Sequence, residues 1–218
     1  AGNLTSAVYR IFGKPFSEEG KKLFGVPFAQ FLKLNSEFRY HYRIDKNQMI
    51  ASRIAGGVIW SYGNATTAPY TEQFYIGGAN SVRAFSARSI GPGGYPPETD
   101  RKYTYINHVG DIRIEANIEY RFRMIADLHG AVFLDAGNVW LMRKDENRPD
   151  GEFTLKNFPK QIALGTGFGL RYDLDFLVFR LDLGIGLHDP YDTGKSGYYN
   201  IPKFKDSMAL HFAIGYPF

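Results

Sequence analysis

Apolar and polar residues alternate along much of this chain. The pattern is complete between residues 111 and 123, where apolar side chains take every second position: Ile112, Ile114, Ala116, Ile118, Tyr120 and Phe122. Charged or amide side chains fill the positions between them. Because successive side chains of a β-strand point to opposite faces, this period of two predicts a strand with one apolar and one polar face.

Eight segments of this kind are separated by turn-forming residues, so we predict eight antiparallel strands. Their approximate ranges are 4–12, 30–44, 49–60, 110–122, 128–141, 161–173, 177–188 and 207–218. The first alternates poorly, and its faces are not assigned. Short turns at 45–48, 124–127 and 173–176 alternate with long connections at 13–27, 61–109, 142–160 and 189–206. Short turns at one end and long loops at the other are typical of outer-membrane barrels.

Aromatic side chains gather on the apolar face at the short-turn end of the predicted strands. They are Tyr40, Tyr42, Tyr120, Phe122, Tyr172, Tyr216 and Phe218. Aromatic rings favour the interface between lipid and water, so this set is interpreted as one interfacial girdle. The predicted fold class is therefore all-β, an antiparallel transmembrane β-barrel that occupies residues 1–218 as one domain. Phe218 is then expected in the periplasm, with 61–109 as a long extracellular or lumen-docking loop.

Composition argues against transmembrane helices and against a nucleic-acid-binding protein. The mean hydropathy of -0.29 is compatible with a barrel, because barrel strands carry apolar side chains on one face only. No stretch approaches the roughly 18 apolar residues of a transmembrane helix, so a spanning protein must here use a closed sheet. A net charge of +4, without a basic cluster interleaved with aromatics, argues against nucleic acid as a partner. No targeting segment precedes Ala1, so we expect a processed chain or a fragment.

Two motifs point to a family. Residues 77–85 read Gly-Gly-x-x-Ser-Val-Arg-x-Phe, with the motif positions Gly77, Gly78, Ser81, Val82, Arg83 and Phe85. Residues 133–140 read Phe-Leu-Asp-Ala-Gly-Asn-Val-Trp. Together they resemble the C-terminal barrel half of the bacterial outer-membrane assembly factors, the BamA/TamA-like superfamily or bacterial surface antigen family, over about residues 28–218. The resemblance implies the outer membrane of a Gram-negative bacterium.

Arg83 is the candidate functional residue of the loop. If the turn at 124–127 closes a hairpin, Glu119 and Asp135 lie near each other on the inner face and repel. The planar fork of an arginine can hold two carboxylates, and the alternative is a solvated loop charge. The resemblance implies the first reading, because the family's loop arginine docks against the inner barrel wall. Ala84 departs from the glycine of many relatives, and is expected to be strained if that position needs a positive φ.

Enzymatic and metal chemistry find little support. There is no Gly-x-Ser-x-Gly motif, and the five histidines lack metal-ligand spacing. Ser207 and His211 share a face of the last strand, but four residues of extended chain separate them by about 13 Å. The acidic residues between 145 and 152 do not have the spacing of a calcium loop. We therefore expect no enzyme, no catalytic residue, no cofactor and no metal.

The last strand carries a further expectation, because its outward residues and terminal aromatic resemble the signal by which outer-membrane barrels are recognised. The residues of this predicted C-terminal seam strand are Phe212, Ile214, Gly215, Tyr216 and Phe218. Pro217 removes one ladder hydrogen bond, which weakens pairing at the end. In the assembly factors the seam between the last and first strands opens sideways.

The resemblance implies folding and insertion of outer-membrane β-barrel proteins, by strand templating at that lateral seam. The implied partners are unfolded outer-membrane protein precursors, the lipid bilayer, and accessory assembly subunits reached through missing N-terminal periplasmic domains. Two alternatives stay open: a protein-secreting pore of the same superfamily, and a stand-alone eight-stranded structural barrel or adhesin. Family barrels have sixteen strands. The interior of an eight-stranded barrel only holds side chains, so the long loop could not fold inside one.

Overall fold

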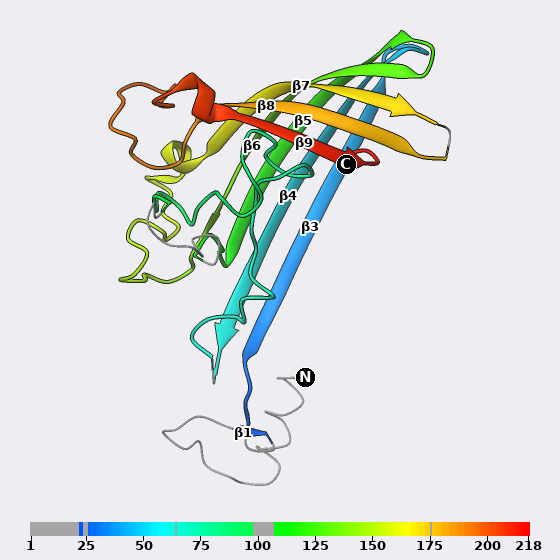
Figure 1. The fold of residues 1–218 in the computed structure, drawn as a ribbon. Helices are drawn as coiled ribbons and strands as arrows, with labels where there is room; N and C mark the ends of the chain where they lie inside the picture. The colour runs from blue at the N-terminus through cyan, green and yellow to red at the C-terminus, as the bar shows by residue number, and fades with distance from the viewer. Residues whose placement is uncertain (1–21, 24–25, 64, 98–106, 175) are drawn as a thin grey trace.

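Seven strands form one antiparallel sheet in the computed structural model, which describes residues 22–23, 26–63, 65–97, 107–174 and 176–218 (Figure 1). Each strand pairs with the next along the chain. They are β3 (Gln30–Arg43), β4 (Gln48–Tyr62), β5 (Ile112–Ile125), β6 (Leu128–Trp140), β7 (Ala163–Asp173), β8 (Val178–His188) and β9 (Met208–Ile214). Two short 3-10 helices, η2 (Phe158–Gln161) and η3 (Phe204–Ser207), lie in the long connections.

The sheet confirms seven of the eight predicted strands, and the eighth, at 4–12, lies outside the described residues. The predicted connection at 13–27 contains a two-stranded pair, β1 (Lys22–Leu23) with β2 (Val26–Pro27). The described sheet begins at β3 and ends at β9, and these two strands do not pair with each other there. In the part of the chain that the structure describes, no helix is long and apolar enough to span a membrane.

The two faces of the sheet differ as the alternation predicts. One face exposes large apolar side chains on nearly every strand, including Ile54, Ile118, Leu134, Phe168, Leu181 and Phe212. The opposite, inner face buries small or polar residues such as Ala51, Ala131 and Asp182. Tyr40, Tyr42, Tyr120 and Tyr172 of the predicted girdle all lie on the exposed face. A sheet that presents apolar side chains outward and polar ones inward suits a lipid surface.

The long connection between β4 and β5 covers the inner face, in the middle of the sheet (Figure 1). Its apolar residues Ile76, Val82 and Ile90 are fully buried and form one cluster with Ile59 of β4 and Val139 of β6. Burying each such side chain contributes about 1.5–3 kcal/mol relative to leaving it in water. The loop is therefore packed against the strands, and its motif is held at a defined place.

The C-terminal end departs from the prediction. Strand β9 ends at Ile214, because Gly215 has a φ of +85° and turns the chain. Phe218, expected on the lipid face, is only 7% exposed, and its carbonyl oxygen accepts a hydrogen bond from Arg121 on the inner face. The Cζ atom of the same guanidinium lies 4.5 Å from the centre of the Tyr216 ring. Tyr216 and Phe218 therefore do not belong to the outward aromatic girdle.

Candidate functional site

Two glycines shape the loop that carries the motif. Gly77 and Gly78 have φ values of +97° and +90°, which side chains other than glycine rarely adopt. The Gly77 amide donates to the Ser81 hydroxyl oxygen at 3.1 Å, and the Gly78 amide donates to the carbonyl of Phe85 at 2.8 Å. These bonds close a compact loop between 77 and 85. The side chain of Arg83 points from this loop toward the sheet.

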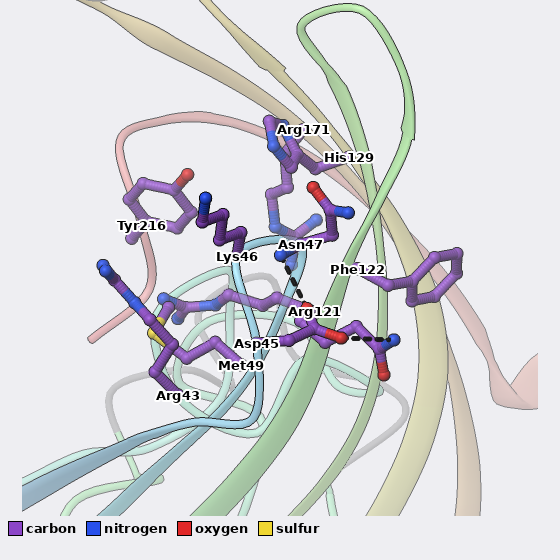
Figure 2. Close-up of a pocket in the computed structure, with 11 residues that line it drawn as sticks. Arg43, Asp45, Lys46, Asn47, Met49, Arg121, Phe122, His129, Arg171 and Tyr216 are labelled. Atoms are coloured by element: carbon purple, nitrogen blue, oxygen red, sulfur yellow. Dashed lines mark hydrogen bonds between the residues drawn. The ribbon is translucent and has the colours of Figure 1, made fainter.

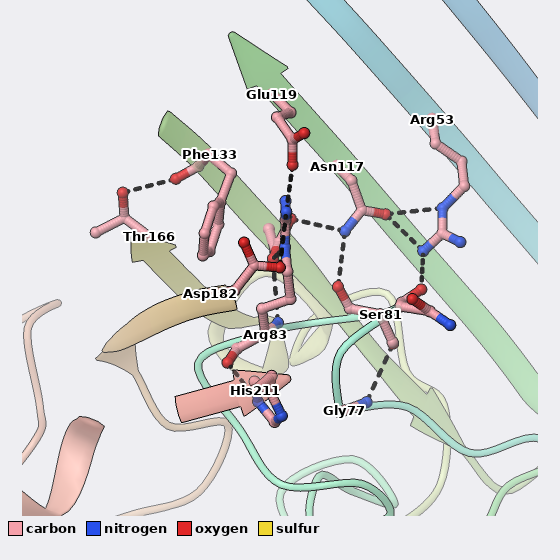
Figure 3. A network of polar contacts seen from close by, with 12 residues as sticks. Arg53, Gly77, Ser81, Arg83, Asn117, Glu119, Phe133, Thr166, Asp182 and His211 are labelled. Atoms are coloured by element: carbon pink, nitrogen blue, oxygen red, sulfur yellow. Dashed lines mark hydrogen bonds and ion pairs between the residues drawn. The ribbon is translucent and has the colours of Figure 1, made fainter. Parts of the chain in front are cut away.

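Arg83 is completely buried between two strands of the inner wall (Figure 3). Its Nε and Nη2 donate to the two carboxylate oxygens of Asp135 on β6, at 2.8 and 2.9 Å. Its Nη1 donates to Glu119 on β5. The backbone amide of Arg83 adds a fourth bond, to Asp135 at 3.1 Å. The fork geometry of arginine thus bridges the two acids that sequence reasoning placed side by side.

Burial disfavours the charged form of Arg83, but the hydrogen bonds and charges of Asp135 and Glu119 outweigh this cost and raise the pKa of Arg83. The guanidinium also lies 3.5 Å from the ring centre of Phe133, within cation–π range. Arg83 is therefore ionised and held on three sides. A loop that is anchored through such a group leaves the wall only by breaking a buried ion network.

Glu119 is the centre of this network. Besides Arg83, it accepts hydrogen bonds from Arg121 Nε at 2.7 Å and from Arg171 Nη2 at 3.0 Å. Arg171 continues the network to Asp182 on β8, at 2.5 Å. Asp182 Oδ2 in turn lies 3.8 Å from Arg83 Nη1. One loop arginine is thereby tied to carboxylates on three strands.

A second set of bonds fixes the loop beside Arg83. Asn117 donates to the Ser81 carbonyl at 3.0 Å and to Asp135 at 2.8 Å, so it joins loop and wall (Figure 3). Arg53 of β4 donates to the Asn80 carbonyl at 3.0 Å and forms an ion pair with Glu115. These partners hold the loop backbone directly.

Glycines on the inner face make room for the loop. A side chain at Gly184 would overlap the carbonyl of Arg83, and one at Gly165 would overlap Ala84. His211 Nε2 of β9 lies 2.9 Å from the Arg83 carbonyl oxygen, so the last strand also contacts the loop. Ala84 is absent from the described non-glycine residues with positive φ, so the strain expected there is not found.

The structure brings most of the predicted site residues together and leaves some apart. Ser81, Val82, Arg83, Glu119 and Asp135 meet at the inner wall, while Phe85 packs against the buried apolar cluster. The side chains of Phe212 and Ile214 are exposed on the outer face of β9, away from this network. Sequence reasoning missed the roles of Asp182, Arg171 and His211 in the network. Their inward position in the alternation was the available signal.

The arrangement positions the loop against the inner face of the sheet. Within the described residues no group of three or more histidine, cysteine or acidic side chains could hold a metal. The carboxylates of the network are all paired with arginines. What the network can do is hold a loop inside the sheet and couple it to β5, β6, β8 and β9.

Comparison with known proteins agrees with this architecture. Residues 23–218 match the Omp85 superfamily domain. The chain is 28% identical over 204 residues to the outer membrane protein assembly factor BamA of Nitratidesulfovibrio vulgaris, which covers 91% of this chain and 22% of that protein. It is 29% identical over 89 residues to BamA of Neisseria meningitidis serogroup B, covering 38% of this chain and 11% of that protein.

Among solved structures, BamA from Haemophilus ducreyi lacking POTRA domains 1–3 has a similar fold. The TM-score is 0.59 at 17% identity, over 85% of this chain and 35% of that chain. The seven-stranded sheet thus corresponds to part of the BamA barrel. The chain spans about a fifth of the length of the BamA from Nitratidesulfovibrio vulgaris. It belongs to the Omp85 superfamily and is a bacterial outer-membrane protein that is similar to BamA in sequence and fold.

Proposed function

We propose that this chain is the membrane-embedded C-terminal part of a factor that folds and inserts other outer-membrane β-barrel proteins. The observation that carries the proposal is the Arg83 network, found in a chain that matches an outer membrane protein assembly factor along 91% of its length. The clients would be unfolded barrel precursors. Accessory assembly subunits would reach it through domains that precede the barrel.

The last strand supports a templating mechanism. Strand β9 pairs with β8 through only seven residues, and its other edge has no partner strand among the described residues. Gly215 ends the strand early, so the seam between last and first strands would be short. An unpaired edge offers backbone N–H and C=O groups to an incoming strand. Such pairing lowers the cost of bringing polar backbone into lipid.

The Arg83 loop would hold the barrel in the shape that presents this edge. His211 of β9 contacts the Arg83 carbonyl, while Arg83 itself is bonded to β5 and β6. Loop docking and the position of the last strand are therefore coupled through one residue. Loss of the arginine side chain would release the loop from the wall and loosen the position of β9.

The test is Arg83→Ala in the intact protein, in cells that depend on it. We expect lower levels of folded outer-membrane barrels at normal expression of the variant, because the loop loses its buried anchor. Arg88→Ala is the matched control, since Arg88 lies on the same loop, 4.0 Å from the Tyr75 ring centre, and outside the network. Unchanged barrel levels in Arg83→Ala cells would sink the proposal for Arg83.

A secretion pore of the same superfamily makes a different prediction in the same cells. Its Arg83→Ala variant would lower one exported protein in the medium and leave barrel levels unchanged. Measuring both fractions separates the two functions. The assembly reading is preferred because the relatives matched at 28% and 29% identity are both assembly factors.

A further inference from the structure

A basic cavity of about 140 Å³ lies on the inner face, at the short-turn end of the sheet (Figure 2). Its charged and aromatic lining includes Arg43, Lys46, Arg121, His129, Arg171 and Tyr216. Arg43 ends β3, Lys46 lies in the turn that follows, and the others come from β5, β6, β7 and the C-terminal segment. One water molecule needs about 10–15 Å³ of such space, so the cavity has room for a carboxylate or phosphate group with water.

The positive charge at the entrance of this cavity has no ion-pair partner among the described residues, whereas Glu119 and Asp182 pair with the deeper arginines. Arg43 and Lys46 form no ion pair with any residue that the structure describes, and both are exposed. The acid in the lining is Asp45, and its two oxygens already accept bonds from the Asn47 amide at 2.7 Å and from Gln48 Nε2 at 3.1 Å. Asp45 therefore shapes the turn and forms no ion pair with Arg43 or Lys46, so its charge offsets only part of the positive charge at the entrance.

The two deeper arginines are preorganised. Glu119 holds Arg121 and Arg171 from behind, at 2.7 and 3.0 Å, and both are buried. Arg171 Nε has no hydrogen-bond partner among the described residues. Guanidinium groups fixed in this way bind a carboxylate or phosphate at little further cost in conformational entropy.

Part of the wall beside these cations is apolar. Met49 and the ring of Tyr216 line the cavity, and Tyr216 stacks over Arg121. An acidic side chain carries its carboxylate on an aliphatic stem, which such walls accommodate. A free inorganic anion would make no use of them. The cavity also opens on the inner face, whereas lipid headgroups lie against the outer face.

We propose that this cavity binds a carboxylate side chain of an acidic polypeptide segment that reaches the short-turn end of the barrel. Arg43 and Lys46 supply attraction at the entrance, and Arg121 and Arg171 receive the carboxylate. The site shares Arg121 and Arg171 with the Glu119 network, but it lies at the mouth of the inner face and does not use the edge of β9, and its entrance residues Arg43 and Lys46 are outside that network.

The experiment uses the intact outer-membrane protein in detergent micelles and a fluorescent peptide of Gly, Ser and Glu, with a Gln-for-Glu peptide as its match. We expect the acidic peptide to bind, more weakly as salt rises, and the Gln peptide not to bind. The double variant Arg43→Gln/Lys46→Gln should weaken binding about tenfold, since two charge-assisted contacts are lost. Fluorescence anisotropy measures each affinity.

The control is Lys144→Gln/Lys156→Gln, which removes the same two charges from exposed loops at the opposite end of the sheet. It should keep the affinity of the unmodified protein, and circular dichroism checks that both variants are folded. Equal weakening in both double variants would overturn the proposal in favour of general charge attraction. It is also overturned if the acidic peptide does not bind, or if inorganic phosphate binds as tightly and displaces it.

Discussion

At the scale of single residues, Glu119 is the side chain that forms hydrogen bonds with the most arginines in the network between the loop and the wall. Three arginines, Arg83, Arg121 and Arg171, bond to its two oxygens, and its side chain is fully buried. Removing ions from water is costly, and only the complete set of partners compensates for it. A neutral group at this position would leave three buried cations sharing the remaining acids.

We therefore expect Glu119→Gln to lower the free energy of unfolding of the intact protein by about 3–5 kcal/mol, the usual cost of breaking a buried pair. Glu37→Gln is the control, because its partner Arg39 is 54% exposed and exposed pairs contribute about 0–1 kcal/mol. Urea midpoints in micelles, measured by circular dichroism, compare the two. Similar midpoints for both variants would mean that the network carries no special stability.

At the scale of elements, the strands were predictable because the period of two is a local property of each segment. The same alternation predicted that hairpin pairing brings Glu119 near Asp135, and the family resemblance supplied Arg83 as the partner of both. The end of β9 was not predictable in this way. Its alternation continues to Phe218, and the turn at Gly215 depends on the inner-face arginines that receive Tyr216 and Phe218.

The position on the sheet where the loop docks could not be predicted from local sequence patterns either. Glycines on β7 and β8 look like weak strand positions in the sequence, and they occupy the inward positions of the alternation. In the structure the loop lies directly against both glycines: the backbone of Arg83 faces Gly184, and the side chain of Ala84 faces Gly165. Their role is set by contacts with residues that lie 81 and 101 positions earlier in the chain, which no local pattern records.

These glycines provide a test at the element scale. Gly184→Ala should displace the loop, because the added methyl would overlap the Arg83 carbonyl and lie 2.7 Å from Ala84 Cα. We expect faster trypsin cleavage after Arg83 and Arg88 in the intact protein. Gly186→Ala, two residues along the same strand, meets nothing closer than 3.4 Å and should cleave as slowly as the unchanged protein. Equal cleavage of both variants would argue against a tightly seated loop.

At the scale of the whole molecule, the docked loop limits how the sheet can close. Arg83 contacts β5, β6 and β9, and its neighbour Asn80 contacts β4 and β8. The loop thus crosses most of the inner face. An eight-stranded barrel has an interior just wide enough for its own side chains, so it cannot also enclose this loop. Both faces of β3 are exposed, as expected for a strand whose surroundings are incomplete.

We therefore expect these seven strands to belong to a larger barrel in the native protein. An antibody raised against this chain should detect, in outer membranes, a polypeptide several times heavier than 24.7 kDa. The reason is geometric: only additional strands widen the barrel enough for the loop to stay docked on Glu119 and Asp135. Peptide mapping of the detected band is the control for cross-reaction. A single band near 24.7 kDa would instead require a small barrel with the loop displaced, and would remove the structural basis of the assembly proposal.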